Sequence, residues 1–491
     1  MRLSELLTRL PGAELSGDPG LELSEVTHDS RRVSAGALFV AIRGLATDGN
    51  RFVEAARRKG ALAVVSEEAP RGEGTWVRVA DARAALALLS AAALGDPARS
   101  LELVGVTGTN GKTTTAYLID AAVRAAGEKC GLVGTVEYRV GERVAEAVRT
   151  TPESSDLQAL FRQMVDAGCR RAVLEVSSHS LALERVHGLE FSVAVFTNLT
   201  RDHLDFHGDM DRYFAAKRLL FESLLREDGH AIVNLDAERA EELLRASRGT
   251  VWTYSLENPA ADLLCEELSL SLDGTRLRAR TPVGPLELET VLLGRFNVQN
   301  LLAAAGAALA LGLPTDAVRR GIAGLRGVPG RMELVDAGQP FTVLVDYAHT
   351  DDALRNLLET VRGLKPRRVI TLFGCGGDRD RSKRPLMGAV AARLSDLVVL
   401  TSDNPRSEPP EAILEEIRRG IPPARAEDTL VLPDRREAIA RALETAGPGD
   451  VVVIAGKGHE AYQVLRERSV PFDDRQVARE VLSRLLAGGR R

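Results

Sequence analysis

Aromatic residues and cysteines are scarce in this sequence of 491 residues. Phe, Trp and Tyr make up only 4% of it, which argues against a stacking platform for single-stranded nucleic acid. The four cysteines, Cys130, Cys169, Cys265 and Cys375, are scattered and form no Cys-X-X-Cys pair. A disulfide framework or a zinc knuckle is therefore not expected, and a reducing compartment fits this usage.

The sequence also lacks a strong charge excess and a long apolar run. Its 64 Lys and Arg against 69 Asp and Glu give a net charge of −5, which argues against a protein that coats nucleic acid. The longest uncharged apolar stretch, residues 301–313, is too short to cross a bilayer and predicts a buried helix. No signal peptide is visible at the start. We expect a cytoplasmic protein that neither binds nucleic acid nor inserts into a membrane.

The length and the turn-rich segments predict several domains, because one hydrophobic core rarely organises a chain this long. A turn-like GDPARS segment at residues 95–100 ends the first part, and a Gly/Pro-rich segment at 324–331 begins the third. We predict an α/β protein with three domains, at residues 1–98, 99–328 and 329–491.

Apolar runs that end in polar or glycine-rich segments predict parallel strands in the second and third parts. Ligands of such sheets bind at the carboxyl ends of the strands. Residues 268–293 alternate instead, which predicts antiparallel hairpins with an Asp-Gly turn at 273–274 and a Pro-Val-Gly turn at 282–284. The runs are VLEVSS (173–178), VAVFTNLT (193–200), TVLVDYAH (342–349), RRVITLFGCGG (367–377), DLVVLTSDNP (396–405) and DVVVIAGKG (450–458).

The strongest local signal is VGVTGTNGKTTT at residues 104–115, a strand followed by a glycine-rich turn and a helix. Backbone N–H groups of such a turn attract phosphate oxygens. Lys112 would approach the β- and γ-phosphates, and the Thr113 hydroxyl would hold Mg²⁺. Val106 departs from the general pattern, which has glycine there, and a chance glycine turn is the alternative. Glu175, at a strand end, is the candidate carboxylate near the metal, unless it is simply a solvated acid.

Residues 197–220 combine two histidines with several acids. The spacing of His203 and His207 would suit zinc on a helix, but Gly208 and the acidic context predict a loop, and no third ligand is evident. Lys217, on the helix that follows, is interpreted from the sequence alone as an ordinary surface lysine.

Taken together and in order, many motifs along the whole chain resemble those of the Mur ligases. They are GTNGKTTT, TTPESSDLQAL, LEVSSHSLAL, TNLTRDHLDFHGDMDRYFAAK, GRFNVQNLLAA, GVPGRME, VDYAHTDDAL, GCGGDRDRSKRP, SDNPR and AGKGHE. The resemblance implies an N-terminal domain for a UDP-linked substrate, a central P-loop ATPase and a C-terminal Rossmann-like domain for the incoming amino acid. The implied reaction converts a carboxylate to an acyl phosphate with ATP and then to an amide.

The resemblance also implies the cofactors, the substrates and most site residues. The cofactors are ATP and Mg²⁺, and the substrates are UDP-N-acetylmuramoyl-dipeptide and meso-diaminopimelate, bound by a monomer. The catalytic residues are Lys112, Lys217, Glu175 and His203. The ATP-binding residues are Gly108, Thr109, Asn110, Gly111, Lys112, Thr113, Thr114, Asn297, Asn300, Arg331, Asp346 and His349, with Arg331 and Asp346 arriving on domain closure. The metal residues are Thr113, Glu175, His203 and a carbamylated Lys217.

Residues for the two organic substrates follow from the same resemblance. Leu183 and Asn50 depart from the family, which often has Gln and His at these two positions. The residues implied for the UDP substrate are Ser30, Thr150, Thr151, Ser177 and Arg185. Those implied for diaminopimelate are Arg379, Asp403, Asn404, Pro405, Arg406, Gly456 and Glu460.

Arg406 has a physical reason to select the amino acid. Its planar guanidinium pairs bidentately with a carboxylate. Diaminopimelate has a distal carboxylate whereas lysine has only an ammonium, so Arg406 should favour the first, and Glu460 would pair with the distal ammonium. The alternative is that Arg406 is an exposed arginine in a turn and has no part in binding. Other open alternatives are a ligase for D-Ala-D-Ala, a folylpolyglutamate synthase and a nucleotide-gated scaffold with a degenerate ATPase.

Overall fold

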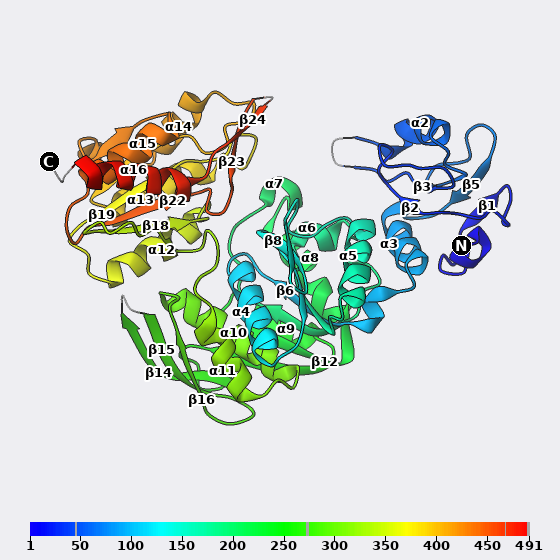
Figure 1. Cartoon of the computed structure of the whole chain (residues 1–491), viewed down its shortest axis with the longest axis horizontal. Helices are drawn as coiled ribbons and strands as arrows, with labels where there is room; N and C mark the ends of the chain where they lie inside the picture. Colours follow the sequence, from blue (N-terminus) through cyan, green and yellow to red (C-terminus); the bar gives the residue numbers. More distant parts are fainter. Residues whose placement is uncertain (45–46, 272–273, 467, 489–491) are drawn as a thin grey trace.

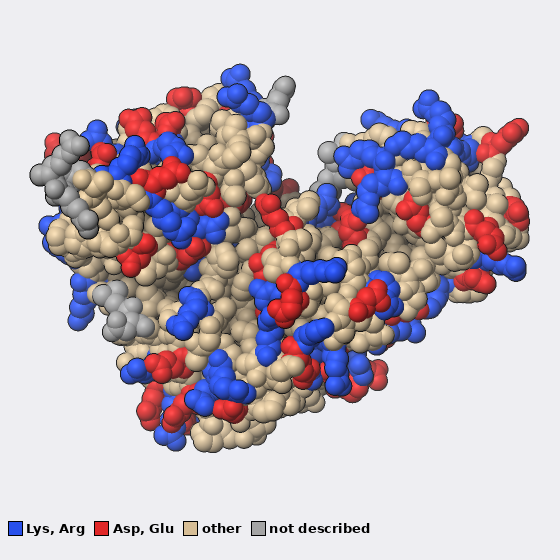
Figure 2. Space-filling model, viewed as in Figure 1, with Lys and Arg blue, Asp and Glu red and all other residues tan. Residues whose placement is uncertain are grey.

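The computed structural model describes residues 1–44, 47–271, 274–466 and 468–488. The N-terminal and C-terminal domains both stand on the central domain and are separated from each other (Figure 1). Figure 2 shows a hollow between them above the central domain. The predicted three-domain α/β architecture is confirmed, whereas the exact domain boundaries stay a prediction.

The N-terminal domain is built on a sheet of order β1-β5-β4-β3-β2, in which only β1 runs antiparallel to its neighbour among the described pairs. Helix α3 packs its Leu and Ala residues against one face of this sheet. The strands are β1 (Glu14–Ser16), β2 (Val26–Thr27), β3 (Leu38–Val40), β4 (Ala63–Ser66) and β5 (Thr75–Arg78). The helices are α1 (Leu3–Leu7), η1 (Gly49–Phe52), α2 (Val53–Arg58), α3 (Ala82–Ala93) and η2 (Pro97–Ser100).

The central sheet has the order β16-β15-β14-β13-β12-β11-β6-β10-β7-β8-β9, with parallel strands in its middle and antiparallel hairpins at both ends. Helices α4, α10 and α11 bury their apolar sides against one face, and α5, α6, α8 and α9 against the other. The strands are β6 (Glu102–Thr107), β7 (Cys130–Val133), β8 (Glu137–Val140), β9 (Arg143–Glu146), β10 (Arg171–Glu175), β11 (Phe191–Phe196), β12 (Leu225–Asn234), β13 (Thr250–Ser255), β14 (Leu263–Ser271), β15 (Gly274–Arg280) and β16 (Leu286–Thr290). The helices are α4 (Lys112–Ala125), α5 (Ser154–Asp166), α6 (Ser178–Ala182), α7 (Leu204–His207), α8 (Met210–Glu222), α9 (Ala240–Ala246), α10 (Arg295–Ala310) and α11 (Thr315–Gly324).

The C-terminal sheet has the order β17-β18-β22-β19-β20-β21, with β17 antiparallel at one edge. Helices α12, α13 and α14 cover one face, and α15 and α16 the other. The strands are β17 (Glu333–Leu334), β18 (Thr342–Asp346), β19 (Val369–Phe373), β20 (Leu397–Leu400), β21 (Thr429–Val431), β22 (Val451–Ala455), β23 (Tyr462–Leu465) and β24 (Arg468–Pro471). The helices are α12 (Asp351–Gly363), α13 (Lys383–Leu394), α14 (Pro410–Arg418), η3 (Pro423–Arg425), α15 (Arg435–Thr445) and α16 (Asp474–Gly488).

The local predictions for strands and hairpins are confirmed. All six apolar runs form strands, and β14, β15 and β16 pair antiparallel as the alternation of residues 268–293 indicates. The Pro-Val-Gly turn is closed by a hydrogen bond from Gly284 N to Thr281 O, whereas Asp273 of the Asp-Gly turn lies outside the described residues. The predicted buried helix is α10. In the part of the chain that the structure describes, no helix combines the length and apolarity that crossing a bilayer requires.

Candidate active site

The glycine-rich turn between β6 and α4 depends on two glycines. Gly108 has φ +145°, and a Cβ there would lie 1.9 Å from Thr197 Oγ1. Gly111 has φ +86°, and a Cβ there would lie 2.3 Å from Asn300 Oδ1. Only glycine combines these backbone conformations with such close neighbours. The turn therefore delivers the chain into α4, whose first N–H groups have no intrahelical partner and face the position that a phosphate would take.

Two lysines converge on the same turn. Lys112 Nζ donates to the carbonyl oxygens of Gly108 and Thr109, at 3.0 and 2.7 Å. Lys217 Nζ donates to Gly108 O at 2.7 Å. Burial lowers the pKa of Lys112, and burial together with the Lys112 charge lowers the pKa of Lys217 well below its usual range. The two groups thus share one small region beside the turn.

The interpretation of Lys217 as a surface lysine is wrong, because its side chain is buried with 1% exposure. It lies on the apolar face of α8, one helical turn from Tyr213 and Phe221. Helical periodicity could therefore have placed it inside. Its ammonium also lies 4.4 Å from the centre of the Tyr213 ring, a cation–π contact that partly offsets desolvation.

Glu175 ends β10 beside the helix start. Its carboxylate accepts hydrogen bonds from Thr113 Oγ1 at 3.0 Å, and from Thr135 N and Oγ1 at 2.8 and 2.9 Å. The alternative of a solvated acid is wrong, because Glu175 is 1% exposed. Sequence reasoning missed Thr135, although it follows the carboxyl end of β7, where such sheets place functional groups. A carboxylate next to a threonine hydroxyl is an oxygen donor set that suits Mg²⁺.

The segment after β11 differs from the predicted loop. Residues 204–207 form the short helix α7, which begins after His203 at φ +54° and ends at Gly208. Packing of Phe206 on His179, with ring centres 4.2 Å apart, stabilises this turn. His203 Nε2 lies 3.3 Å from Asp202 Oδ2, whereas His207 pairs with the Ser178 hydroxyl at 2.9 Å. The two histidines thus have separate partners, and no three His, Cys, Asp or Glu side chains form a candidate metal site within the described ranges.

A cavity of about 750 Å³ joins these features. Its wall comes from both the central and the C-terminal domains. All the residues expected around the nucleotide and the metal line it, namely Gly108, Thr109, Asn110, Gly111, Lys112, Thr113, Thr114, Glu175, His203, Lys217, Asn297, Asn300, Arg331, Asp346 and His349. The structure therefore brings together groups that lie far apart in the sequence, while their individual roles stay predictions.

The C-terminal domain already lies against this cavity. Arg331 Nη2 donates to Thr113 Oγ1 at 3.1 Å, and its guanidinium carbon lies 4.7 Å from the centre of the Tyr347 ring. Asp346, at the end of β18, accepts hydrogen bonds from Met332 N and Ala348 N, both at 2.7 Å. Burial raises the pKa of Asp346, against the lowering effect of Arg331. Arg331 and Asp346 thus lie in the wall of the cavity, and their arrival on domain closure stays a prediction.

The residues expected to bind the UDP substrate form a group beside Glu175, except for Ser30. Thr151 Oγ1 donates to Glu175 O at 2.7 Å, and Ser177 N donates to Thr151 Oγ1 at 3.2 Å. Arg185 Nη1 donates to Thr151 O at 3.1 Å. The fourth member, Thr150, contacts the Thr135 hydroxyl at 3.1 Å. Ser30 comes from another domain, in the turn after β2 of the N-terminal domain.

The two departures from the family pattern have structural roles of their own. The Asn50 side chain makes two hydrogen bonds within the N-terminal domain. Its Nδ2 donates to Asp48 Oδ1 at 2.8 Å, and its Oδ1 accepts from the Ser66 hydroxyl at 2.6 Å. The carbonyl oxygen of Leu183 accepts from Arg83 Nη1 at 3.5 Å. Leu183 therefore joins the central domain to the N-terminal domain through its backbone.

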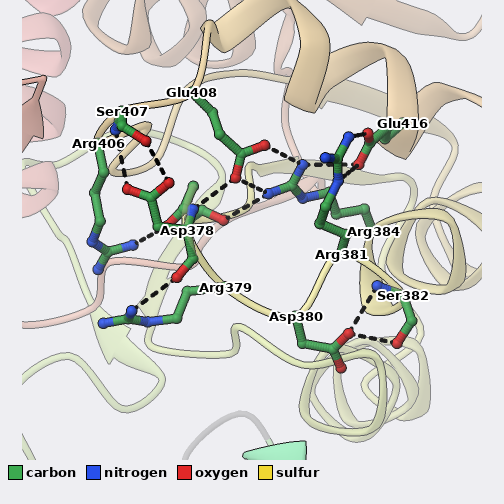
Figure 3. Close-up of polar contacts among 12 residues, drawn as sticks. Asp378, Arg379, Asp380, Arg381, Ser382, Arg384, Arg406, Ser407, Glu408 and Glu416 are labelled. Carbon is green, nitrogen blue, oxygen red and sulfur yellow. Dashed lines mark hydrogen bonds and ion pairs between the residues drawn. The ribbon is translucent and has the colours of Figure 1, made fainter. Parts of the chain in front are cut away.

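The residues expected to bind diaminopimelate gather at the carboxyl ends of β19, β20 and β22. Arg406 Nη1 donates to Gly377 O at 2.7 Å, and Arg379 Nη1 donates to Asp378 O at 3.0 Å (Figure 3). Burial and the neighbouring Arg379 charge lower the pKa of Arg406. Two neighbouring guanidinium groups would suit an anionic ligand, and the binding of diaminopimelate here stays a prediction. None of these diaminopimelate residues lines the 750 Å³ cavity.

Glu460, expected to meet the distal ammonium, already has an internal cation. Its Oε2 accepts from Lys457 Nζ at 3.0 Å and from Asn404 Nδ2 at 2.8 Å. The Lys457 side chain is completely buried. Sequence reasoning missed this lysine, whose place between two glycines at the end of β22 was the available signal. Gly456 at φ +110° keeps the two loops close, because a Cβ there would lie 2.7 Å from Asp403 Oδ2.

Buried ion pairs support the loops that carry these residues. Arg435, paired with Asp474, donates to Ser402 O at 3.2 Å and to Ala455 O at 3.0 Å, just before the loops that carry Asp403 and Gly456. Arg384 has 0% exposure and pairs with Glu408 and Glu416, and Glu408 accepts from Asp378 N at 2.7 Å (Figure 3). These pairs fix the spacing of the pocket loops.

Comparisons with known proteins agree with this geometry. A model described as Mur ligase middle domain matches residues 106–308, one described as Mur ligase, glutamate ligase domain matches residues 330–458, and one described as Mur ligase family, catalytic domain matches residues 22–94. The UDP-N-acetylmuramoyl-L-alanyl-D-glutamate–2,6-diaminopimelate ligase of Solibacter usitatus is 51% identical, with 98% of each chain covered. The protein of the same name from Geobacter metallireducens is 46% identical, with 100% of each chain covered.

Solved structures give the same result. The structure of a UDP-N-acetylmuramoyl-L-alanyl-D-glutamate–2,6-diaminopimelate ligase aligns with a TM-score of 0.71 and 34% identity over 99% of both chains. A folylpolyglutamate synthase of Mycobacterium tuberculosis, complexed with ADP and AMPPCP, aligns with a TM-score of 0.62 and 21% identity over 75% of this chain and 91% of the other. The second likeness shows the shared fold alone. The full-length relatives, the three matched models and the arrangement of the site together show that this chain belongs to the Mur ligase family.

Proposed function

We propose that this chain is an ATP-dependent ligase that adds meso-2,6-diaminopimelate to UDP-N-acetylmuramoyl-L-alanyl-D-glutamate during peptidoglycan precursor synthesis. Full-length relatives carry the name of this activity. The observation that carries the proposal is the cavity in which the phosphate turn, Lys217 and Glu175 meet Arg331 of the C-terminal domain, the domain whose strand ends also carry the neighbouring guanidinium groups of Arg379 and Arg406.

The reaction follows from the chemistry of a carboxylate, which is a poor acyl donor at neutral pH. An oxygen of the D-Glu carboxylate attacks the γ-phosphorus of ATP, and ADP leaves. The amine of diaminopimelate then attacks the acyl carbon, loses a proton and expels phosphate, which keeps the carboxylate oxygen. Lys112 and the N-terminus of α4 stabilise the negative charge that develops on the phosphoryl oxygens. Arg331, anchored on Thr113, adds a further cation from the C-terminal domain.

A magnesium ion fits the donors present. Glu175 and Thr113 would hold it, with phosphate oxygens completing the shell, and the ion would neutralise charge on the transferred phosphoryl group. His203 is expected nearby. Lys217 adds a second anionic ligand only if it is carbamylated, and its environment favours that change. A neutral amine is the form that attacks CO₂, and burial beside Lys112 favours the neutral amine.

The choice of amino acid would lie with the C-terminal pocket. Arg406 and Arg379 would bind the distal carboxylate of diaminopimelate, while Glu460, held by Lys457 and Asn404, would face its ammonium. Lysine lacks the distal carboxylate, so it would leave both guanidinium groups without a partner. We infer that the enzyme works as a monomer in the cytoplasm, where nucleotide-linked precursors and ATP are available.

A product-mass assay tests this function. The protein is incubated with ATP, Mg²⁺, the UDP-linked dipeptide and, in turn, meso-diaminopimelate, L-lysine or D-Ala-D-Ala. We expect an amide product with diaminopimelate, with ADP and phosphate formed in equal amounts. Lysine should be used about 30-fold less efficiently or worse, because each unmet charge at such a site costs at least about 2 kcal/mol. Equal use of lysine, or a product only with D-Ala-D-Ala, would contradict the proposal.

A further inference from the structure

Arg201 connects the nucleotide cavity of the central domain with the C-terminal domain. It follows β11, and its loop is fastened to the phosphate turn. Thr200 N donates to Thr109 Oγ1 at 3.0 Å, and Thr109 Oγ1 donates to Thr200 O at 3.1 Å. The next residues, Asp202 and His203, line the cavity. The position of the Arg201 backbone is therefore set by the turn that would hold ATP.

The Arg201 side chain reaches two separate elements of the C-terminal domain. Its Nη2 donates to Asp351 at the start of α12, at 2.6 Å. Its Nη1 donates to Asp380 and to the Ser382 hydroxyl, both at 3.0 Å, in the loop between β19 and α13. The planar guanidinium serves both carboxylates at once, which a lysine ammonium does less well. Next to this contact, Asn110 Nδ2 lies 3.3 Å from Asp352 Oδ2.

The loop held by Arg201 also carries the amino-acid pocket. Asp380 directly follows Arg379, and its Oδ1 accepts from Ser382 N at 2.8 Å. Asp378, on the other side of Arg379, accepts from the Ser407 hydroxyl at 2.6 Å (Figure 3). One loop thus joins Arg201 at one end to the segment of Arg406 at the other. A continuous series of contacts leads from the phosphate turn to the two guanidinium groups.

We propose that Arg201 is a positioning residue that clamps the C-terminal domain onto the central domain, so that the bound amine meets the acyl phosphate and ATP use is coupled to amide formation. The inference rests on the proposed function. An ordinary surface ion pair would contribute little, but the side chains of Arg201, Asp351 and Asp380 are only 29, 19 and 22% exposed. Loss of the clamp would leave phosphorylation possible and let water compete with the amine for the acyl carbon.

The test compares Arg201→Gln with the parent protein, using meso-diaminopimelate as the amine. We expect kcat for amide formation to fall about 10- to 100-fold, the scale for a misplaced reactant. The KM for diaminopimelate should rise. The KM for ATP should stay within about twofold of that of the parent protein, because the Arg201 side chain contacts none of the residues expected to hold the nucleotide phosphates. Phosphate release should exceed amide formation, whereas the parent protein gives equal amounts. Arg201→Lys should lie between the two.

Two further variants keep the test decisive. Arg226→Gln removes an arginine that pairs with Asp228 on the surface of the same domain, at 45 and 70% exposure, and should behave like the parent protein. If Arg201→Gln does not fold, the double variant Asp351→Asn with Asp380→Asn removes the partners and should give the same uncoupling. Unchanged KM values with equal phosphate and amide in the folded variants would overturn the clamp. A parent protein that forms no amide with diaminopimelate would instead overturn the proposed function.

Discussion

Replacing Lys217 with methionine should lower kcat for amide formation by about 100- to 1000-fold, the scale for removing one stabilising group around a developing charge. Methionine keeps the apolar stem on the buried face of α8 and removes only the group next to the phosphate turn. Steady-state amide formation under saturating substrates measures the effect. The KM for diaminopimelate should change little, because Lys217 lies in the nucleotide cavity and not among the residues of the amino-acid pocket.

The chemical form of Lys217 can be tested separately. Arg218→Met changes the neighbouring position, where a partly exposed arginine pairs with Glu222, and should leave kcat near that of the parent protein. Depletion of CO₂ should reduce the activity of the parent protein, and added bicarbonate should restore it but not that of Lys217→Met. Intact-mass measurement should find one added CO₂ on the active parent protein. A fully active preparation with an unmodified Lys217 would refute the carbamate.

Replacing Arg406 with alanine should weaken the binding of diaminopimelate by about 2–4 kcal/mol, the scale for leaving one partner of a buried charge pair unmatched. The variant should also lose much of its preference over lysine, because the preference depends on the distal carboxylate. Both effects appear as a change in kcat/KM for the two amino acids, while the KM for ATP stays constant.

A matched control separates this effect from a general loss of charge. Arg419→Ala removes an exposed arginine after α14 in the same domain and should leave both kcat/KM values unchanged. Arg406→Lys should retain part of the affinity, since a single ammonium replaces the bidentate fork. An Arg406→Ala variant with unaltered affinity for diaminopimelate would mean that the pocket has been assigned to the wrong residues.

The parts of the site that depend on local sequence could be predicted. The turn before α4 needs glycine at positions 108 and 111 because a Cβ there would clash with its neighbours, and both glycines are part of the sequence motif. Glu175 could be placed because parallel strands align their carboxyl ends at one edge of the sheet. The grouping of Arg379, Arg406 and Glu460 could be predicted for the same reason, since β19, β20 and β22 are neighbours in one sheet.

The remaining features depend on contacts between distant segments. Arg201 looks like any charged loop residue until Asp351 and Asp380 are seen on the other domain. Lys457 stands between two glycines, but its contact with Asn404 Oδ1, at 3.2 Å, joins two loops that are far apart in the sequence. The turn of helix at α7 arises from packing of Phe206 on His179, which outweighs the loop-forming tendency of Gly208 and the neighbouring acids. Tertiary packing, and not local propensity, decides each of these.

The fate of the D-Glu carboxylate oxygens tests most directly whether the phosphate turn and the guanidinium pocket serve one reaction. The UDP-linked dipeptide, labelled with heavy oxygen in that carboxylate, is incubated with ATP, Mg²⁺ and diaminopimelate, and the products are analysed by mass. Transfer through an acyl phosphate places one labelled oxygen in the released phosphate for every amide formed, with ADP as the other product. Unlabelled phosphate, or label found in AMP, would contradict the account.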